Sequence, residues 1–194
     1  MNSQKYQPIQ VNTLPLWEKV IAHAWICVNA TLYRYSLCFC RGWRRLLLRL
    51  FGADIHPTSS PGRFARIEFP WNVKLGAYSS LGANSWIFAR TRIVIGDKTC
   101  ISEGVKLVAG THDITDYHFK LVTAPIVVGS YCWIATSATL LPGVVVGDGV
   151  VVGACAVVAK SVAPWSVVVG NPARIIKKRE FREIESNNTI GSTL

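Results

Sequence analysis

The sequence predicts a mainly β protein in which short parallel strands wind into a triangular coil. The first observation is a six-residue period of apolar residues through the second half of the chain, anchored at Val128, Ile134, Leu140, Val146, Val152 and Val158. The second is that Gly or Ala follows five of these anchors, and a small or β-branched residue stands four positions after each. A period of six fits neither a helix nor a flat strand, so we expect three hexads in each coil of about 18 residues.

The same period extends upstream with one interruption. Its anchors there are Leu75, Leu81, Ile87 and Ile93 and, after a slip of two residues, Ile95, Ile101 and Leu107. Before Leu75 the pattern fades through Phe69 to an expected start near Ile55. Residues 110–125 lack the period and are expected to form a loop. Parallel strands lie about 4.8 Å apart, so roughly five coils would stand about 24 Å tall.

The residue after each anchor is expected to shape the corners of the coil. Anchors must point into the prism, whereas a large side chain at the next position would collide or demand an unfavourable φ. This pattern resembles the left-handed parallel β-helix of the hexapeptide-repeat proteins, here expected over residues 53–172. A sandwich or barrel would instead show alternation with turn signals every 8–12 residues.

The outer walls of this prism predict association between copies. Residues 126–169 are rich in valine and contain one acid, Asp148, and one base, Lys160. Because a strand has two faces, some of these apolar side chains must point outward. A homotrimer with threefold symmetry, which is usual for proteins of this resemblance, would cover them.

Residues 1–52 are expected to form a helical segment. Residues 16–39 are mostly apolar, and Arg41, Arg45 and Arg49 then follow at a spacing that places them on one helix face. Two interpretations remain open. The segment caps the open end of the β-helix, or its arginines, Arg44 included, hold it loosely on an anionic membrane surface. We expect no membrane span and no signal peptide.

The net charge of +10 suits an anionic partner such as nucleic acid, acidic lipid or a phosphorylated cofactor. The positions of the basic residues help to decide among these partners. The bases concentrate in the N-terminal segment and in residues 173–194, which are expected to form a basic tail. A nucleic-acid binder would more often spread them over the folded body among exposed aromatic residues, so no nucleic-acid partner is expected. The six cysteines form neither a CxxC pair nor a disulfide framework, which favours a cytoplasmic location, with peripheral contact at the inner membrane face if the segment binds lipid.

His112 is the strongest candidate for a catalytic residue. It lies where the hexad frame stops and the loop departs, and loops that leave a rigid scaffold often carry function. A neutral imidazole can take a proton from an alcohol near neutral pH. A metal site would need further ligands, and no third histidine stands at a plausible height for His112 and His118. We therefore predict no metal site.

Several motifs carry a resemblance to a known family. They are Ile101-Ser102-Glu103-Gly104, Gly110-Thr111-His112-Asp113, Ala124-Pro125-Ile126, Cys132-Trp133-Ile134-Ala135-Thr136, Pro142-Gly143-Val144 and Gly170-Asn171-Pro172-Ala173. With them, residues 17–178 resemble the hexapeptide-repeat O-acetyltransferases, most of all the colanic-acid biosynthesis acetyltransferase group. The resemblance implies that acetyl-CoA is the acyl donor and that His112 is the general base. Either Asp113 or a backbone carbonyl would orient the imidazole.

The resemblance also implies the residues that bind the two substrates. The expected acetyl-CoA-binding residues are Trp133, Thr136, Ala154, Ala159, Lys160, Arg174 and Lys177. Trp133 would lie beside the pantetheine arm, and Arg174 and Lys177 would meet the phosphates. The acceptor residues of the galactoside enzymes do not map cleanly, so Asn84, Arg90, Asp116 and Lys120 are weaker candidates.

The expected activity is O-acetylation of a sugar hydroxyl, free or on a lipid-linked glycan, in exopolysaccharide or related biosynthesis. Two alternatives remain open. The acceptor could instead be serine, an antibiotic or an amino sugar, although the long acidic N-terminal domain of the serine enzymes is absent. A non-catalytic hexapeptide scaffold is the other alternative.

Overall fold

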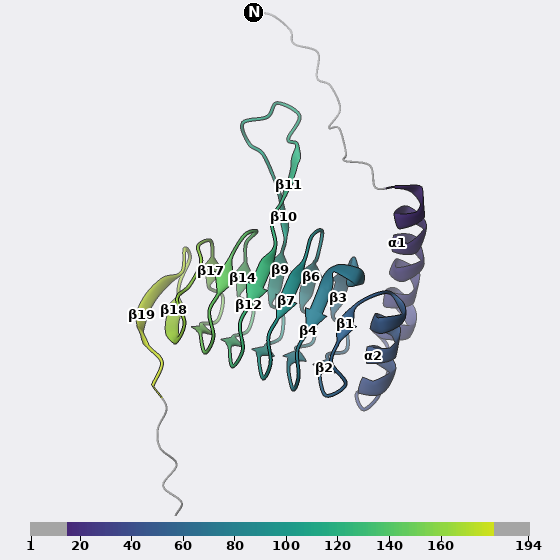
Figure 1. The fold of residues 1–194 in the computed structure, drawn as a ribbon, viewed down its shortest axis with the longest axis horizontal. Helices are drawn as coiled ribbons and strands as arrows, with labels where there is room; N and C mark the ends of the chain where they lie inside the picture. The colour runs from purple at the N-terminus through teal and green to yellow at the C-terminus, as the bar shows by residue number, and fades with distance from the viewer. Residues whose placement is uncertain (1–14, 181–194) are drawn as a thin grey trace, which may run out of the picture.

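The computed structural model describes residues 15–180, so residues 1–14 of the expected N-terminal segment and residues 181–194 of the expected tail lie outside the described residues. The described chain is a left-handed parallel β-helix with a helical cap at one end (Figure 1). The cap contains α1 (Leu16–Val28), a π-helical turn η1 (Asn29–Tyr33) and α2 (Arg41–Leu50). The predicted fold class is confirmed.

Three parallel sheets form the walls of the prism. Wall A contains β1 (Asp54–Ile55), β4 (Val73–Leu75), β7 (Ile93–Ile95), β12 (Ile126–Val128) and β15 (Val145–Val146). Wall B contains β2 (Ser60–Pro61), β5 (Ser80–Leu81), β8 (Cys100–Ile101), β13 (Trp133–Ile134), β16 (Val151–Val152) and β18 (Ser166–Val169). Wall C contains β3 (Arg66–Glu68), β6 (Trp86–Phe88), β9 (Lys106–Val108), β14 (Thr139–Leu140) and β17 (Val157–Val158).

The anchors predicted from the period form the core. On wall B the register aligns Leu81 with Ile101, Ile101 with Ile134, and Ile134 with Val152. These anchors are at most 2% exposed, as are the small residues that follow four positions later, such as Ala138 and Val150. Each anchor packs against the equivalent anchor of the next coil, which explains the six-residue period of apolar residues in the sequence.

The first coil differs from the prediction. Its start at Ile55 is confirmed, but its anchors are Ile55, Pro61 and Ile67, which pair with the second coil, whereas Phe69 lies at a corner with φ of 56°. Counting back by six from Leu75 therefore reached the wrong residue. The reason is that the corner from wall C to wall A, here called the C/A corner, is two residues longer in this coil, as it is between Ile87 and Ile95.

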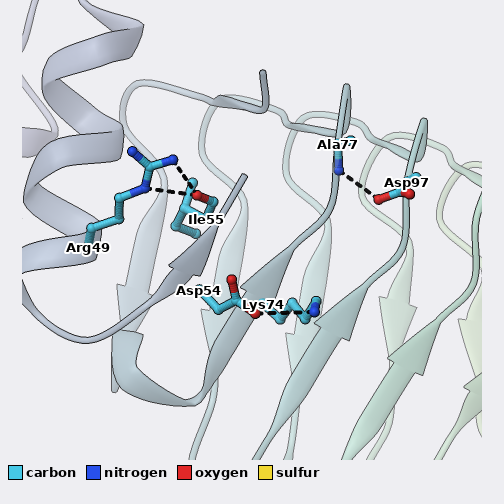
Figure 2. Close-up of polar contacts among 6 residues, drawn as sticks. All are labelled: Arg49, Asp54, Ile55, Lys74, Ala77 and Asp97. Carbon is cyan, nitrogen blue, oxygen red and sulfur yellow. Dashed lines mark hydrogen bonds and ion pairs between the residues drawn. The ribbon is translucent and has the colours of Figure 1, made fainter. Parts of the chain in front are cut away.

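The glycine after each anchor acts through close approach alone. A Cβ added to Gly82 would lie 2.4 Å from the backbone nitrogen of Glu103 in the next coil, which no substitution could accommodate without backbone movement. The unfavourable φ expected at this position occurs two residues later instead, as at Tyr78 and Asn84 with φ of 57° and 56°. Hydrogen bonds between coils support these corners, and Figure 2 shows the one from the Ala77 amide to the Asp97 carboxylate, 2.7 Å long.

Two segments are more ordered than the sequence suggested. The expected loop 110–125 contains an antiparallel hairpin, β10 (Gly110–His112) with β11 (Leu121–Thr123), which projects from the C/A corner of the third coil (Figure 1). The expected basic tail begins with β19 (Arg174–Lys178), which pairs antiparallel with β18 and extends wall B. Residues 173–180 are therefore part of the folded body rather than a free tail.

The helical cap covers the open edge of the first coil, and its donors reach all three walls. Arg49 donates twice to the carbonyl oxygen of Ile55 on wall A, at 2.9 and 2.6 Å (Figure 2). On wall B, Arg44 donates to Pro61 O at 2.8 Å. On wall C, the indole of Trp25 donates to Ile67 O at 2.6 Å. Unpaired carbonyls at a strand edge would otherwise invite association, so the capping interpretation of this segment agrees with the structure.

The guanidinium groups of Arg44, Arg45 and Arg49 are consequently directed at the first coil. Arg44 is 2% exposed and also donates to Ser36 Oγ and to the carbonyls of Leu37 and Cys38, while Arg45 donates to Ser59 O at 2.9 Å. The basic helix face, for which a membrane contact was one of the two interpretations, thus faces the β-helix edge. Within the described part of the chain, no helix has the length and apolar character needed to cross a bilayer.

Candidate active site

His112 lies at the end of β10, where the hairpin leaves the prism. It pairs with Leu121 across the hairpin, and its side chain is exposed. Its Nδ1 lies 2.6 Å from the carbonyl oxygen of Phe119. Since a carbonyl can only accept, Nδ1 must carry the proton in this hydrogen bond. In the neutral imidazole Nε2 then holds the lone pair, which is the form required of a general base.

The orienting group of His112 is therefore the Phe119 carbonyl, one of the two options that the sequence left open. Asp113, the other option, binds elsewhere: its Oδ1 accepts from Thr115 Oγ1 at 2.6 Å and from the Thr115 amide at 2.9 Å. These hydrogen bonds hold the pKa of the Asp113 carboxyl below its ordinary value. In this arrangement Asp113 shapes the turn of the hairpin and does not contact the imidazole.

The four acceptor-site candidates occupy different places. Asp116 is structural in the hairpin, where its carboxylate accepts from the His118 amide at 2.8 Å and its carbonyl accepts from the Phe119 amide at 2.9 Å. Lys120 follows Phe119, and its carbonyl accepts from the Asp113 amide. Both lie in the segment that carries His112.

The other two acceptor-site candidates, Arg90 and Asn84, lie at different corners of the prism. Arg90 lies at the C/A corner one coil before the hairpin, with its guanidinium 5.0 Å from the centre of the Phe69 ring. A Cβ on Gly110 would lie 3.6 Å from Arg90 Cβ, so Arg90 is beside the hairpin base. Asn84 lies at the corner between walls B and C, here called the B/C corner, and the fold does not bring it to His112.

A pocket at the C-terminal end of the C/A corner gathers three of the predicted acetyl-CoA-binding residues. Ala159, Lys160 and Arg174 line it together with apolar residues of β17, β18 and β19, and its volume is about 410 Å³. Lys160 stands two coils beyond the hairpin base, a height difference of about 10 Å at the usual strand spacing. Lys177, the fourth residue of this predicted set, is on β19 opposite Val167 and does not line the pocket.

The remaining three predicted acetyl-CoA-binding residues lie on another part of the prism. Trp133 is on the outer face of wall B, 49% exposed, and its indole donates to Ser102 Oγ at 3.0 Å. Thr136 and Ala154 stack on successive coils at the B/C corner, where the Cys155 amide donates to Thr136 O. In a triangular prism wall B is opposite the C/A corner, so one chain does not bring Trp133 to its own His112.

Sequence reasoning missed Phe119 and Ser102. The Phe119 carbonyl acts through the backbone, so its residue type carries no signal, and only the register of the hairpin reveals it. Ser102 was noticed within a motif but not as the partner of Trp133, which becomes visible once β8 and β13 are paired in register. Among residues 15–180, no three His, Cys, Asp or Glu side chains are grouped so that they could hold a metal ion.

Comparison with known proteins agrees with the fold. Residues 125–160 match the family described as bacterial transferase hexapeptide (six repeats). The chain is 39% identical over 155 residues to WcaF of Escherichia coli (strain K12), which is named as a colanic acid biosynthesis acetyltransferase; the match covers 80% of this chain and 85% of WcaF.

Two solved structures show the same architecture. A maltose O-acetyltransferase from Clostridium difficile 630 has a TM-score of 0.73 at 26% identity and covers 84% of this chain and 88% of its own. The hexapeptide-repeat acetyltransferase VCA0836 of Vibrio cholerae O1 biovar eltor, in complex with acetyl-coenzyme A, has a TM-score of 0.76 at 24% identity and covers 86% of this chain and 91% of its own. The coiled fold, the family match and the identity to WcaF together show that this chain belongs to the hexapeptide-repeat acetyltransferases.

Proposed function

We propose that the protein transfers an acetyl group from acetyl-CoA to a hydroxyl of a sugar used in exopolysaccharide or related glycan biosynthesis, with His112 as the general base. The observation that carries this proposal is the hydrogen bond from His112 Nδ1 to Phe119 O, which leaves Nε2 as a proton acceptor at the base of a projecting hairpin. The choice of acceptor class rests on the 39% identity to WcaF.

The residues of the chain have distinct tasks in this proposal. His112 Nε2 removes the proton of the attacking hydroxyl, and the Phe119 carbonyl keeps the imidazole in the required tautomer and stabilises its protonated form. The acceptor oxygen attacks the thioester carbonyl carbon of acetyl-CoA, forming the new C–O bond. The C–S bond then breaks, and CoA leaves as its thiol with the proton that His112 removed from the hydroxyl. General-base assistance of this kind is worth roughly 10²–10⁴-fold in rate.

The pocket at the C/A corner fits the donor chemically. Lys160 and Arg174 bring two cations to its rim, and cations are the usual partners of phosphate groups. Ala159 and the neighbouring apolar side chains leave room for an uncharged segment of the ligand. The structure thus supports a phosphate-binding role for Arg174 and Lys160 more directly than for Lys177.

We expect Arg174→Ala and Lys160→Ala each to raise the KM for acetyl-CoA about tenfold, because a charge-assisted hydrogen bond contributes on the order of 1.5–3 kcal/mol. The KM for the acceptor should stay within twofold. Steady-state kinetics with thiol release as the readout measures both constants. Lys178→Ala is the matched control, since it removes a cation from the same strand outside the pocket. An equal rise in both KM values would contradict the assignment.

We further propose that the active unit is a homotrimer whose sites lie between copies. His112 departs from the C/A corner, whereas Trp133 lies on wall B, opposite that corner. An acetyl-CoA molecule that contacts both His112 and Trp133 must therefore bind between two chains. Closed rings of identical subunits solve this geometry, because each copy gives one edge to each neighbour.

Mixing two inactive variants tests this shared site. Co-expression of His112→Ala with Ala154→Trp, which fills the opposite edge, should restore roughly a quarter of wild-type activity, because each site draws its two edges from different chains at even odds. Light scattering should report a trimer for each variant. A stable, fully active monomer, or a mixture as inactive as its components, would contradict the proposal.

The acceptor is best identified by a screen of sugars and nucleotide sugars with thiol release from acetyl-CoA as the readout. Transfer to sugar hydroxyls, confirmed by mass spectrometry, would support the proposed function. Exclusive transfer to serine, an antibiotic or an amino group would contradict it and leave the family assignment intact.

A further inference from the structure

The outer surface of the helical cap is apolar, and none of residues 15–180 covers it. We define the outer cap face as the large apolar residues of the cap that are at least 42% exposed. Its members are Leu16, Trp17, Val20, Ile26, Leu32, Tyr35, Leu37, Phe39, Trp43, Leu46 and Leu50. A cluster of this kind on a protein surface marks an interaction site.

Contacts between the helices show that this face is continuous. The Trp43 indole on α2 donates to Leu32 O, 3.1 Å away, which joins α2 to the end of η1. At the other end, Trp17 and Ile21 of α1 and Leu50 of α2 line one apolar recess of about 430 Å³. The recess is completed by Phe51, Gly52 and Trp71. The face therefore contains both protruding side chains and a hollow.

Charge on the cap is divided between its two sides. Arg44, Arg45 and Arg49 bind carbonyl oxygens of the first coil, so they leave the apolar side of α2 facing outward. Residues 15–53 contain a single acid, Glu18, which is half-buried. Lys19 is exposed on α1. Arg41 is exposed at the start of α2, at the margin of the face, where its guanidinium donates to Ser60 Oγ of the first coil at 3.5 Å. The outward side thus combines aliphatic and aromatic side chains with cations and no exposed acid.

We propose that the outer cap face binds the surface of an anionic lipid bilayer and holds the enzyme there. Aliphatic side chains with Trp and Tyr, flanked by cations, are the chemistry of interfacial helices. A flexible acyl chain can fill the recess between the helices. The helices lie across one end of the prism (Figure 1), so the hairpin and the acetyl-CoA pocket stay clear of the bilayer.

A second copy of the chain fits this face less well. Self-association through it would bring together two surfaces that each carry cations, with no exposed acid in residues 15–53 to offset them. A bilayer containing anionic lipid offsets them directly. The charge balance therefore selects the lipid surface over a dimer.

The test uses the full-length protein and sedimentation with vesicles of phosphatidylcholine alone or with 30% phosphatidylglycerol. Wild type should bind both, and several-fold more strongly when the anionic lipid is present. Val20→Glu combined with Phe39→Glu should weaken binding at least tenfold, because both side chains are more than 60% exposed and would carry charge into the apolar interface. Tyr78→Glu is the matched control, an exposed aromatic residue on a corner of the prism, and should bind as wild type.

Two further measurements separate the alternatives. Brominated lipid should quench the fluorescence of wild type, and Trp17→Phe should remove part of that quenching. Light scattering without lipid should give the same molar mass for wild type and for the double variant. Wild type that fails to bind vesicles, binding that survives in the double variant, or a larger assembly that only the double variant dissociates would overturn the proposal. Acetyl transfer to a soluble acceptor, unchanged in every variant, keeps this result separate from the proposed function.

Discussion

Replacing His112 by alanine is expected to lower kcat at least a hundredfold and to leave the fold and assembly unchanged. The side chain is exposed on a hairpin outside the prism and contributes nothing to the core. Its removal takes away the proton acceptor alone, whereas binding of both substrates continues. Thiol release at saturating acetyl-CoA measures the effect, and circular dichroism with light scattering checks the fold.

The control for this substitution is His56→Ala. His56 is also exposed, and its ring bonds only to Thr58 at a corner of the first coil. It should retain nearly full activity. If His112→Ala keeps more than about a tenth of the wild-type rate, the general base is another residue.

Removal of residues 1–52 is expected to abolish soluble, assembled protein. The truncation exposes the carbonyls of Ile55, Pro61 and Ile67, which the cap now pairs, and uncovers the apolar interior of the first coil. An open edge of this kind associates with other strands. The soluble fraction on expression and light scattering of any soluble product measure the outcome.

A smaller change tests the same idea without the loss of a whole segment. Arg44→Met should lower the melting temperature by several degrees, because it leaves buried carbonyls without donors. Deletion of residues 1–14 keeps the capping contacts of Trp25, Arg44 and Arg49 and should leave solubility unchanged. A chain beginning at Ala53 that stays soluble, trimeric and active on a soluble acceptor would contradict the capping role.

The sequence predicted the β-helix because burial repeats there from coil to coil. Each anchor from Val128 to Val158 pairs with the anchor of the same wall in the preceding coil, so its residue type is constrained in the same way. The six-residue period gave the wrong anchor only before Leu75. There the C/A corner is two residues longer, so counting back by six reaches Phe69 instead of Ile67. Corner length depends on backbone path, and the hexad pattern does not encode it.

The site was less predictable than the fold for physical reasons. The position of His112 was visible because the period stops there. Its partner was not, since a backbone carbonyl has no residue type. For the arginines of α2 the sequence left both a capping role and a membrane contact open, because helical spacing shows that they share a face but not what that face meets.

The capped edge has a consequence for how the chain acquires its structure during synthesis. The cap and first coil leave the ribosome before any later coil, and each strand of walls A, B and C then pairs with one made roughly twenty residues earlier, the hairpin coil excepted. Growth therefore begins from an end that is already closed and adds one coil at a time. At every stage a single edge remains open, and it is the one that receives the next strand.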